Sequence, residues 1–275
     1  MELRVAPEEL YLAMTMSNSL ASSASTNSVA QLMFESCNVP VLCIQNSSAM
    51  SVKGIGRDTG MCVDAGAGGI YAVPVVNGKA VSEAAQVLNF GGRDLNELLI
   101  QKLNLVDKKH LISYEKLEAL KAAHWLVAAQ ESEASTGADT IHQLELKDGT
   151  SASVSEAMLQ SCSEEIFKPV TGIAQLTSAS IKSAAIAFDE SIQNELFSNI
   201  LVTGGTSLLK GFASRLASDV QVIEPSQAVN VYQHDQALLS AWSGMNAEAS
   251  TGAVPYVSKQ EYDEIGASVL ERWLQ

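Results

Sequence analysis

The sequence predicts an α/β protein. Short apolar segments typical of buried strands alternate along the chain with segments whose apolar residues fall at helical spacing. Glycine-rich turns follow two of those apolar segments, at strand ends, where ligands bind in open α/β sheets. Of the 275 residues, 47% are hydrophobic and 17% are charged, as in an ordinary folded chain. This length suits one large domain or two modest ones.

The charge and the lack of membrane signals narrow the classes of function. The formal net charge of −14 argues against direct binding to nucleic acid or to acidic membranes. No run of about 18 apolar residues occurs and the first nine residues do not resemble a signal peptide, so neither a membrane span nor a secretory signal is expected. The cysteines form no close pair and the histidines do not cluster with them, which predicts reduced thiols in a cytosolic protein and no zinc site. These residues are Cys37, Cys43, Cys62 and Cys162, and His110, His124, His142 and His234.

The N-terminal region is predicted to hold a loop, a helix and a strand. Residues 17–30 are rich in Ser, Ala and Asn and are typical of a loop, which leads into a helix over Val29 to Cys37. The apolar residues expected on the inner side of that helix are Leu32, Met33 and Phe34. Val39 to Ile44 then forms a short apolar run typical of a buried strand.

A glycine-rich turn between two apolar segments follows. Met61 to Val63 ends at Asp64, and Ile70 to Val76 leaves the turn that contains Gly66 and Gly68. Glycine allows a backbone to turn tightly and to approach a phosphate closely. A carboxylate suits a hard cation such as Mg²⁺. The pattern is equally that of a plain glycine hairpin between two core strands, and Ala67 stands where a second carboxylate would be expected.

Helices and short strands are predicted after this turn. A helix follows Asp94, which sits at its N-terminal end, where a carboxylate is favoured. A second helix is expected over Glu115 to Ala129, and a third over Ser155 to Phe167. Between them the polar segment 131–150 should contain short strands such as Thr140 to Leu146. The apolar residues at helical spacing are Leu95, Leu98, Leu99 and Leu103 in the first helix and Leu117, Leu120, His124 and Val127 in the second.

The last third of the chain repeats the alternation of helix and strand. A helix over Ser178 to Asp189 should bury one stripe, and a strand at Ile200 to Val202 enters the glycines at 204 and 205. The residues of that stripe are Ile181, Ala184, Ala185 and Phe188. The remaining helices are expected over Gly211 to Ala217, Leu238 to Ala249 and Ala267 to Leu274. Of the three tryptophans, all candidate interface anchors, Trp242 is expected in the core and Trp273 in an amphipathic segment that docks internally; Trp125 has no further assignment.

Six stretches in order along the chain resemble the family of actin and the actin-related proteins. They are Leu3 to Glu9 (LRVAPEE), Gln31 to Glu35 followed by Asn38 to Pro40, Gly56 to Gly68, Gly92 to Leu95 (GRDL), Leu201 to Thr206 (LVTGGT) and Ser258 to Glu264 (SKQEYDE). The resemblance is weakest over 104–160. Because the matches span nearly the whole chain, they are far more specific than any single glycine loop.

The resemblance implies the actin-like fold, in which two RNase H-like halves close on a nucleotide, as in Hsp70-type ATPases. It implies that residues 1–56 and 239–275 form part of subdomain one. Residues 57–91 and 169–238 would form subdomain three, and residues 92–168 a divergent subdomain four. The family's first phosphate loop and its subdomain two have no counterpart in these 275 residues.

The resemblance also assigns residues to a phosphate and metal site. Asp64, Gly66 and Gly68 match the second phosphate loop, in which Asp64 would hold Mg²⁺ through water. Gln45 matches the glutamine that orients the attacking water, although a lone glutamine is more typical of a strand end or a loop. Ala67 replaces a second metal-facing aspartate and Tyr71 replaces a histidine that positions water. A degenerate ATPase site is therefore expected.

On the nucleoside side the resemblance is mixed. The residues that match nucleotide-contacting positions are Gly92, Lys121, Gly204, Gly205 and Thr206. Ala122 replaces the glutamate next to that lysine, Leu209 replaces the tyrosine that covers adenine, and Leu238 replaces a further lysine. The glycines are slightly more typical of tight strand-to-helix turns in a hinge. ATP or ADP with Mg²⁺ is the only cofactor that the resemblance implies.

The resulting functional hypothesis is a divergent actin-like protein that acts by association. It would be a cytoskeletal or complex-embedded subunit in the cytoplasm, with other actin-like or cytoskeletal proteins as partners and with weak or no ATP hydrolysis. One alternative is an ATP-binding, slowly hydrolysing actin relative whose missing N-terminal lobe is supplied by another chain or is absent because the gene model is incomplete. Another is a nuclear actin-related subunit of a chromatin-remodelling complex that contacts protein rather than DNA. Conventional self-polymerisation is not expected.

Overall fold

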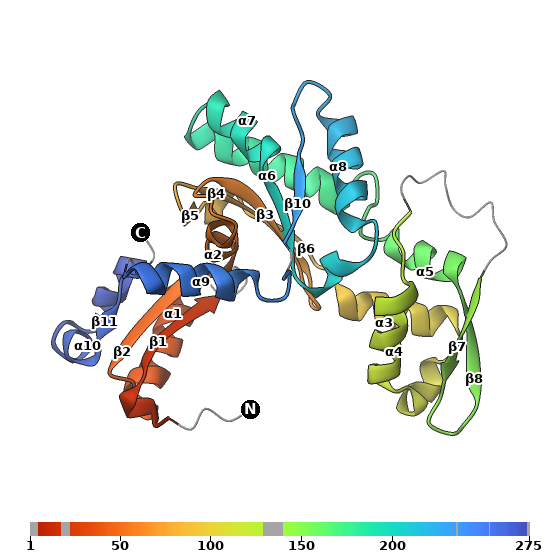
Figure 1. Ribbon diagram of the computed structural model, residues 1–275, viewed down its shortest axis with the longest axis horizontal. Coiled ribbons are helices and arrows are strands. Elements are labelled where there is room, and N and C mark those ends of the chain that lie inside the picture. The colour runs from red at the N-terminus through yellow and green to blue at the C-terminus, as the bar shows by residue number, and fades with distance from the viewer. Residues whose placement is uncertain (1–4, 18–22, 129–139, 235, 253, 274–275) are drawn as a thin grey trace. The chain divides into compact units, whose positions relative to one another are not determined.

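The computed structural model describes residues 5–17, 23–128, 140–234, 236–252 and 254–273 and confirms the predicted α/β class (Figure 1). The chain divides into two compact units. Unit 1 comprises residues 1–59, 75–82 and 239–275, and unit 2 comprises residues 60–74 and 83–238. The finer division into subdomains stays a prediction. In the described residues no helix is both long and apolar enough to cross a membrane.

Unit 1 is built on a three-stranded sheet. β1 (Tyr11–Met16) runs parallel to β2 (Val41–Asn46), and β11 (Val257–Ser258) runs antiparallel to the other side of β2. The central strand is the most buried, since Leu42 and Cys43 are fully inaccessible to solvent. The helices of this unit are η1 (Pro7–Glu9), α1 (Ser23–Gln31), η2 (Leu32–Ser36), α2 (Ser47–Gly54), α9 (Ser240–Thr251), α10 (Lys259–Ile265) and η7 (Ala267–Trp273).

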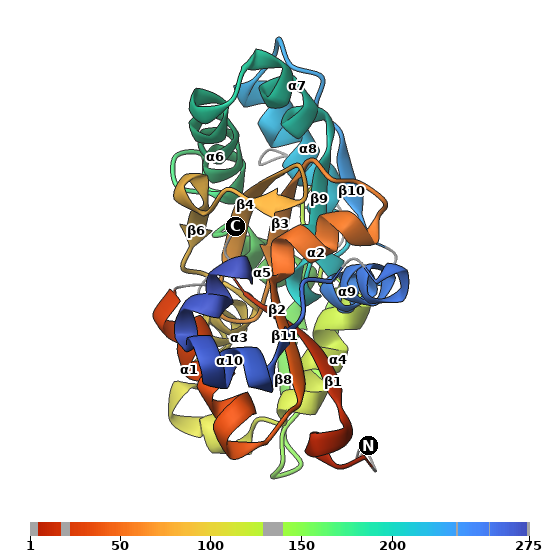
Figure 2. The ribbon, with the colours of Figure 1, turned by 90° about the vertical axis from the view of Figure 1, so that its left-hand side faces the viewer.

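Helices α2 and α9 pack closely because small residues face each other (Figures 1 and 2). A methyl group at Gly244 of α9 would lie 1.7 Å from the carbonyl oxygen of Met50 in α2. The hydroxyls of Ser51 and Ser240 meet at 3.0 Å across the same contact. The close approach therefore depends on the absence of larger side chains on these two faces.

Unit 2 contains a mixed sheet. Its strands are β3 (Gly60–Ala65), β4 (Ile70–Val76), β6 (Gln86–Leu88), β9 (Ile200–Thr203) and β10 (Val231–Gln233). They follow the order β10-β9-β3-β4, with β6 beside β4, and β3 runs parallel to β9 with Asp64 opposite Thr203. The last two residues of β4 belong to unit 1, where they pair with β5 (Lys79–Ala80).

The helices of unit 2 pack against this sheet and against a separate hairpin. They are η3 (Ser82–Ala84, beginning at the last residue of unit 1), α3 (Gly92–Lys102), η4 (Val106–Leu111), α4 (Tyr114–His124), α5 (Glu156–Ser163), α6 (Ile173–Ala187), α7 (Glu190–Ser198), η6 (Gly205–Leu208) and α8 (Phe212–Ile223). Ser180 of α6 donates its hydroxyl toward the carbonyl oxygens of Ala72 and Ala84, at 3.2 and 2.7 Å, which ties α6 to the strand region. The hairpin of β7 (Ile141–Glu145) and β8 (Ser151–Ser155) is a two-stranded antiparallel sheet.

Several predicted elements are confirmed and others are shifted. The glycine hairpin, the helix after Asp94, and the strands near 140–146 and 200–202 are present. The first helix begins at Ser23 rather than Val29, and Leu32 is half exposed, so its inward placement was wrong. The helix expected up to residue 129 ends at His124, where the backbone of the next residue becomes extended.

Helix α2 was missed in the sequence. Asn46 accepts hydrogen bonds from the backbone N–H groups of Ser48 and Ala49, as a helix N-cap does. The capping residue was therefore visible, but the helix that follows has too little apolar periodicity to be recognised. Residues 18–22, 129 and 131–139 and Leu274, which fall in predicted segments, lie outside the described residues.

Two aromatic residues expected in the interior are exposed. Trp242 is 61% exposed, because the face of α9 that meets α2 is made of Ser240 and Gly244 and leaves no room for an indole. Phe188 is 46% exposed, because α6 ends before it and the backbone at Phe188 is no longer helical. The expectation for Trp273 is confirmed: it is buried, and its indole N–H donates to the carbonyl oxygen of Pro255 at 2.7 Å.

Candidate functional site

The glycine turn is a tight connection between β3 and β4. The backbone N–H of Gly66 donates to the carbonyl oxygen of Gly69 at 3.0 Å, which closes the turn. Asp64 precedes the turn at the end of β3, and Tyr71 follows it near the start of β4. The apolar residues on both sides are fully buried, so the turn is anchored by the core.

Two other elements of unit 2 converge on this turn. At the N-terminus of α3, the backbone N–H groups of Gly92 and Arg93 donate to the carbonyl oxygens of Gly66 and Ala67, at 3.0 and 2.8 Å. The hydroxyl of Thr206 in η6 donates to the same Gly66 carbonyl oxygen at 2.9 Å. The structure therefore brings Gly66, Gly92 and Thr206 together, and it joins them to each other directly.

At two further glycines, the surrounding backbone leaves no room for a side chain. Gly204 has φ of +85°, and a methyl group there would lie 2.5 Å from the carbonyl oxygen of Ala65 and 2.6 Å from Oδ1 of Asp64. A methyl group at Gly91 would lie 2.5 Å from the amide nitrogen of Gly69. By contrast, a methyl group at Gly68 would meet nothing within 4 Å. Packing of the chain therefore explains why residues 91 and 204 are glycine. It does not explain why residue 68 is glycine.

Asp64 is the acidic residue nearest the turn, and its carboxylate receives no hydrogen bond from the residues that the structure describes. Burial raises its pKa above the usual value for an aspartic acid, since the charged form loses solvation without gaining a partner. Within the same residues, no group of three or more His, Cys, Asp or Glu side chains is placed to bind a metal ion. A cation at this carboxylate would have a single protein ligand of that type.

Lys121 of α4 is a buried lysine whose ammonium group has three protein acceptors. They are the carboxylate of Glu118 at 3.1 Å, Oδ1 of Asn96 at 3.2 Å and the carbonyl oxygen of Gly92 at 3.3 Å. An ammonium group has three N–H donors, so these contacts use all of them. Lys121 thus connects α4 to the N-terminus of α3.

Glu118 completes this cluster. Partial burial acts to raise its pKa, but hydrogen bonds from Asn96 and Lys121 and the positive charge of Lys121 outweigh burial and lower it. The amide nitrogen of Asn96 donates to Glu118 at 2.8 Å. Every polar side chain of the cluster is therefore satisfied by another member.

The remaining predicted positions are spread over both units. Gln45 lies in β2 of unit 1, where its amide is 3.5 Å from the sulfur of Cys43, and burial raises the pKa of that thiol to about 11. In unit 2 Leu209 is buried and Leu238 is 70% exposed. The methyl position of Gly205 is 3.3 Å from the side chain of Leu238.

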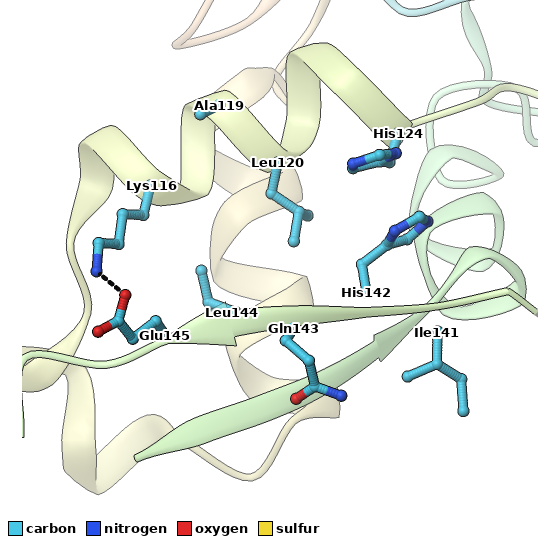
Figure 3. Close-up of a pocket in the computed structure, with 9 residues that line it drawn as sticks. All are labelled: Lys116, Ala119, Leu120, His124, Ile141, His142, Gln143, Leu144 and Glu145. Carbon is cyan, nitrogen blue, oxygen red and sulfur yellow. Dashed lines mark hydrogen bonds and ion pairs between the residues drawn. The ribbon is translucent and has the colours of Figure 1, made fainter. Parts of the chain in front are cut away.

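A second cluster in unit 2 went unrecognised in the sequence. The rings of His124 and His142 stack with centroids 3.7 Å apart, and Nε2 of His142 is 3.4 Å from the carboxylate of Glu156. They line one end of a pocket of about 560 Å³ between α4 and β7, with the ion pair of Lys116 and Glu145 at the other end (Figure 3). The available signal was strand alternation, which puts His142 on the same face as the buried Leu144.

The comparisons with known proteins place the whole chain in one family. The sequence model of the family described as Actin matches residues 1–136 and 117–275. Actin-like protein 7B of Rattus norvegicus is 27% identical over 284 residues, and Actin-like protein 7B of Mus musculus is 26% identical over the same length. Each alignment covers 98% of this chain and 66% of the relative, so the chain spans just under two thirds of the length of these relatives. The chain belongs to the actin family.

Proposed function

We propose that this protein acts by association, as a structural subunit of a cytoskeletal or multi-protein assembly, with weak or no ATP hydrolysis. The observation that carries the proposal is that the polar groups around the glycine turn form hydrogen bonds within the protein. The N–H groups of Gly92 and Arg93, the hydroxyl of Thr206 and the ammonium of Lys121 are all bonded to the protein itself. Groups used in this way are not free to bind a ligand without breaking those contacts.

Members of the actin family generally bind ATP or ADP with Mg²⁺, so the residues present must be tested against that group. Asp64 is a carboxylate without a hydrogen-bonding partner among the described residues and would suit one coordination position of the cation. The other requirements are not met: Ala67 offers no second carboxylate and Lys121 is already neutralised by Glu118. The residues therefore do not fit a charge-neutralising phosphate clamp.

Phosphoryl transfer depends almost entirely on positioning and electrostatic stabilisation. The family resemblance assigns a carboxylate and a histidine to charge stabilisation and to positioning. In this chain Ala67 stands in place of that carboxylate and Tyr71 in place of that histidine. Such losses remove hydrolysis before they remove binding, because binding can still use backbone contacts. A weak nucleotide-binding relative of actin is therefore the second candidate function, favoured by the unpartnered Asp64 carboxylate and by the open space at Gly68.

The expected partners follow from the same proposal. An actin-family chain that does not turn over nucleotide would function through protein surfaces, in contact with other actin-like or cytoskeletal proteins in the cytoplasm. The net charge of −14 supports protein partners rather than nucleic acid or an acidic membrane.

A thermal-shift experiment separates the two candidates. A ligand that binds only the folded state stabilises it by about 2.7 kcal/mol at a hundredfold excess over Kd. We expect no shift of the unfolding temperature in millimolar Mg-ATP. A shift that is present in the native chain and lost in Gly205→Asp would instead establish nucleotide binding. Ser161→Asp, at an exposed position of α5, introduces the same charge outside the candidate site and serves as the control.

A further inference from the structure

The outer edge of β7 has no strand partner in the part of the chain that the structure describes. β7 and β8 form a sheet of two strands. Leu146 donates its N–H to the carbonyl oxygen of Thr150, and Glu156 donates to that of Thr140, which makes the even-numbered residues the hydrogen-bonded pairs. The backbone N–H and C=O groups of Ile141, Gln143 and Glu145 therefore point away from β8, along the open edge.

A groove lies beside this strand. Lys116, Leu120 and His124 form one stripe of α4, and they face the residues of β7 across the pocket of about 560 Å³ (Figure 3). The interior of the groove contains Leu120 and Leu144, both buried. Ile141, at the end of the strand, is 60% exposed. An unpaired strand edge next to a partly apolar groove is the arrangement that binds an extended peptide by strand addition.

The charge of the chain indicates which kind of segment would bind in this groove. Of the charged residues of α4 and β7, Lys116 and Glu145 line the groove and pair with each other, and Glu118 lies outside the lining and pairs with Lys121. Glu115, in the first turn of α4 and outside the lining, leaves these two elements with one carboxylate in excess. The whole chain has a net charge of −14. A second copy of the same chain would therefore be repelled, and a basic segment would be attracted.

We propose that the outer edge of β7 and the adjoining groove bind an extended, basic segment of a partner protein. The backbone of that segment pairs with Ile141, Gln143 and Glu145. Its alternate side chains are apolar and enter the groove over Leu120 and Leu144, because side chains along a strand alternate between the two faces. This inference deepens the proposed function, on which it rests, by naming the surface and the chemistry of the partner.

The first test examines the edge in the full chain without a partner. Backbone amide exchange of Ile141, Gln143 and Glu145 should be faster, by about a hundredfold or more, than that of His142 and Leu144, which bond to β8. Equal protection of both sets would overturn the proposal, since the edge would then already be covered.

The second test uses a random library of linear nine-residue peptides, selected on the full chain, and synthetic copies of the enriched sequences. Gln143→Pro removes an outward N–H from β7, and Ser153→Pro removes one from the opposite edge of the same hairpin. Gln143 and Ser153 are both exposed and share one side-chain hydrogen bond of 3.2 Å, so each variant loses that bond and the two are closely matched.

The proposal expects enriched peptides to be basic with alternating apolar residues. They should bind the native chain and Ser153→Pro equally and Gln143→Pro more weakly, by about tenfold or more. Recovery of no such peptide, equal binding to both variants, or concentration-dependent dimerisation that Gln143→Pro abolishes would each overturn it. Phosphate release from Mg-ATP, measured on the same samples, would contradict the proposed function alone and leave the peptide result unaffected.

Discussion

At the scale of single residues, Lys121 shows how a position that the resemblance assigns to a nucleotide serves the protein's own structure. Its ammonium group lies between Glu118, Asn96 and the backbone of Gly92 and connects two helices. A ligand would have to displace at least one of these acceptors to reach it. Sequence alone identified the lysine but not its partners in α3, because they lie more than twenty residues earlier in the chain.

Replacing this lysine tests whether its role is structural. Lys121→Met leaves Oδ1 of Asn96 and the carbonyl oxygen of Gly92 without their charged donor, so we expect a loss of about 1–3 kcal/mol in the free energy of unfolding. Urea denaturation measures this. Lys116→Met is the control, since its ion pair with Glu145 is exposed and should contribute little. Equal effects of the two substitutions would contradict the structural role.

Asp64 gives a pH-dependent prediction. Because its pKa is raised in the folded protein, the ionised form disfavours folding, and stability falls as the pH rises from the unfolded-state pKa through the folded-state pKa. Asp64→Asn removes this cost. The variant should therefore be more stable than the native chain at pH 7, in the absence of Mg²⁺ and nucleotide, and the difference should vanish below about pH 3.9.

Urea midpoints between pH 3 and pH 7 provide the measurement for Asp64. A variant that is less stable than the native chain at pH 7 would show that the carboxylate has a favourable partner in the folded protein.

At the scale of elements, the glycine turn is held by α3 and η6 as well as by its own hairpin. This arrangement predicts different consequences for two neighbouring glycines. Gly91→Ala should cost about 3 kcal/mol, because its methyl group would overlap the backbone of Gly69 and Ala67. Gly68→Ala should change stability by no more than about 0.5 kcal/mol, because its methyl group meets nothing. Comparable losses in thermal unfolding of both variants would contradict the described packing.

The elements also show which parts of the fold could be predicted from the sequence. Hydrophobic periodicity located the β3–β4 hairpin, α3 and β9, since each buries a regular apolar pattern. It failed at Trp242, because the approach of α2 to α9 is decided by small residues on both helices. It also missed the stack of His124 on His142, which depends on the packing of α4 against the hairpin. Local patterns therefore identified the elements, and long-range packing decided which residues meet.

At the scale of the whole molecule, nearly all residues of the candidate site belong to one unit. Gln45 belongs to unit 1, whereas unit 2 contains Asp64, Gly66, Gly68, Gly92, Lys121, Gly204, Gly205 and Thr206. Sequence predicted which residues resemble a nucleotide site, and the structure adds that several of them bond to one another. Within unit 2, Gly66 is bonded to Gly92 and Thr206, and Lys121 is paired with Glu118, whereas the Asp64 carboxylate has no hydrogen-bonding partner among the described residues.

Phosphate release from Mg-ATP by the full chain tests the central claim most directly. We expect no release above that of Gly205→Asp, measured over hours at saturating nucleotide. Release that requires Mg²⁺, exceeds the Gly205→Asp level and is lost in Asp64→Asn would contradict the claim and establish this chain as an ATPase.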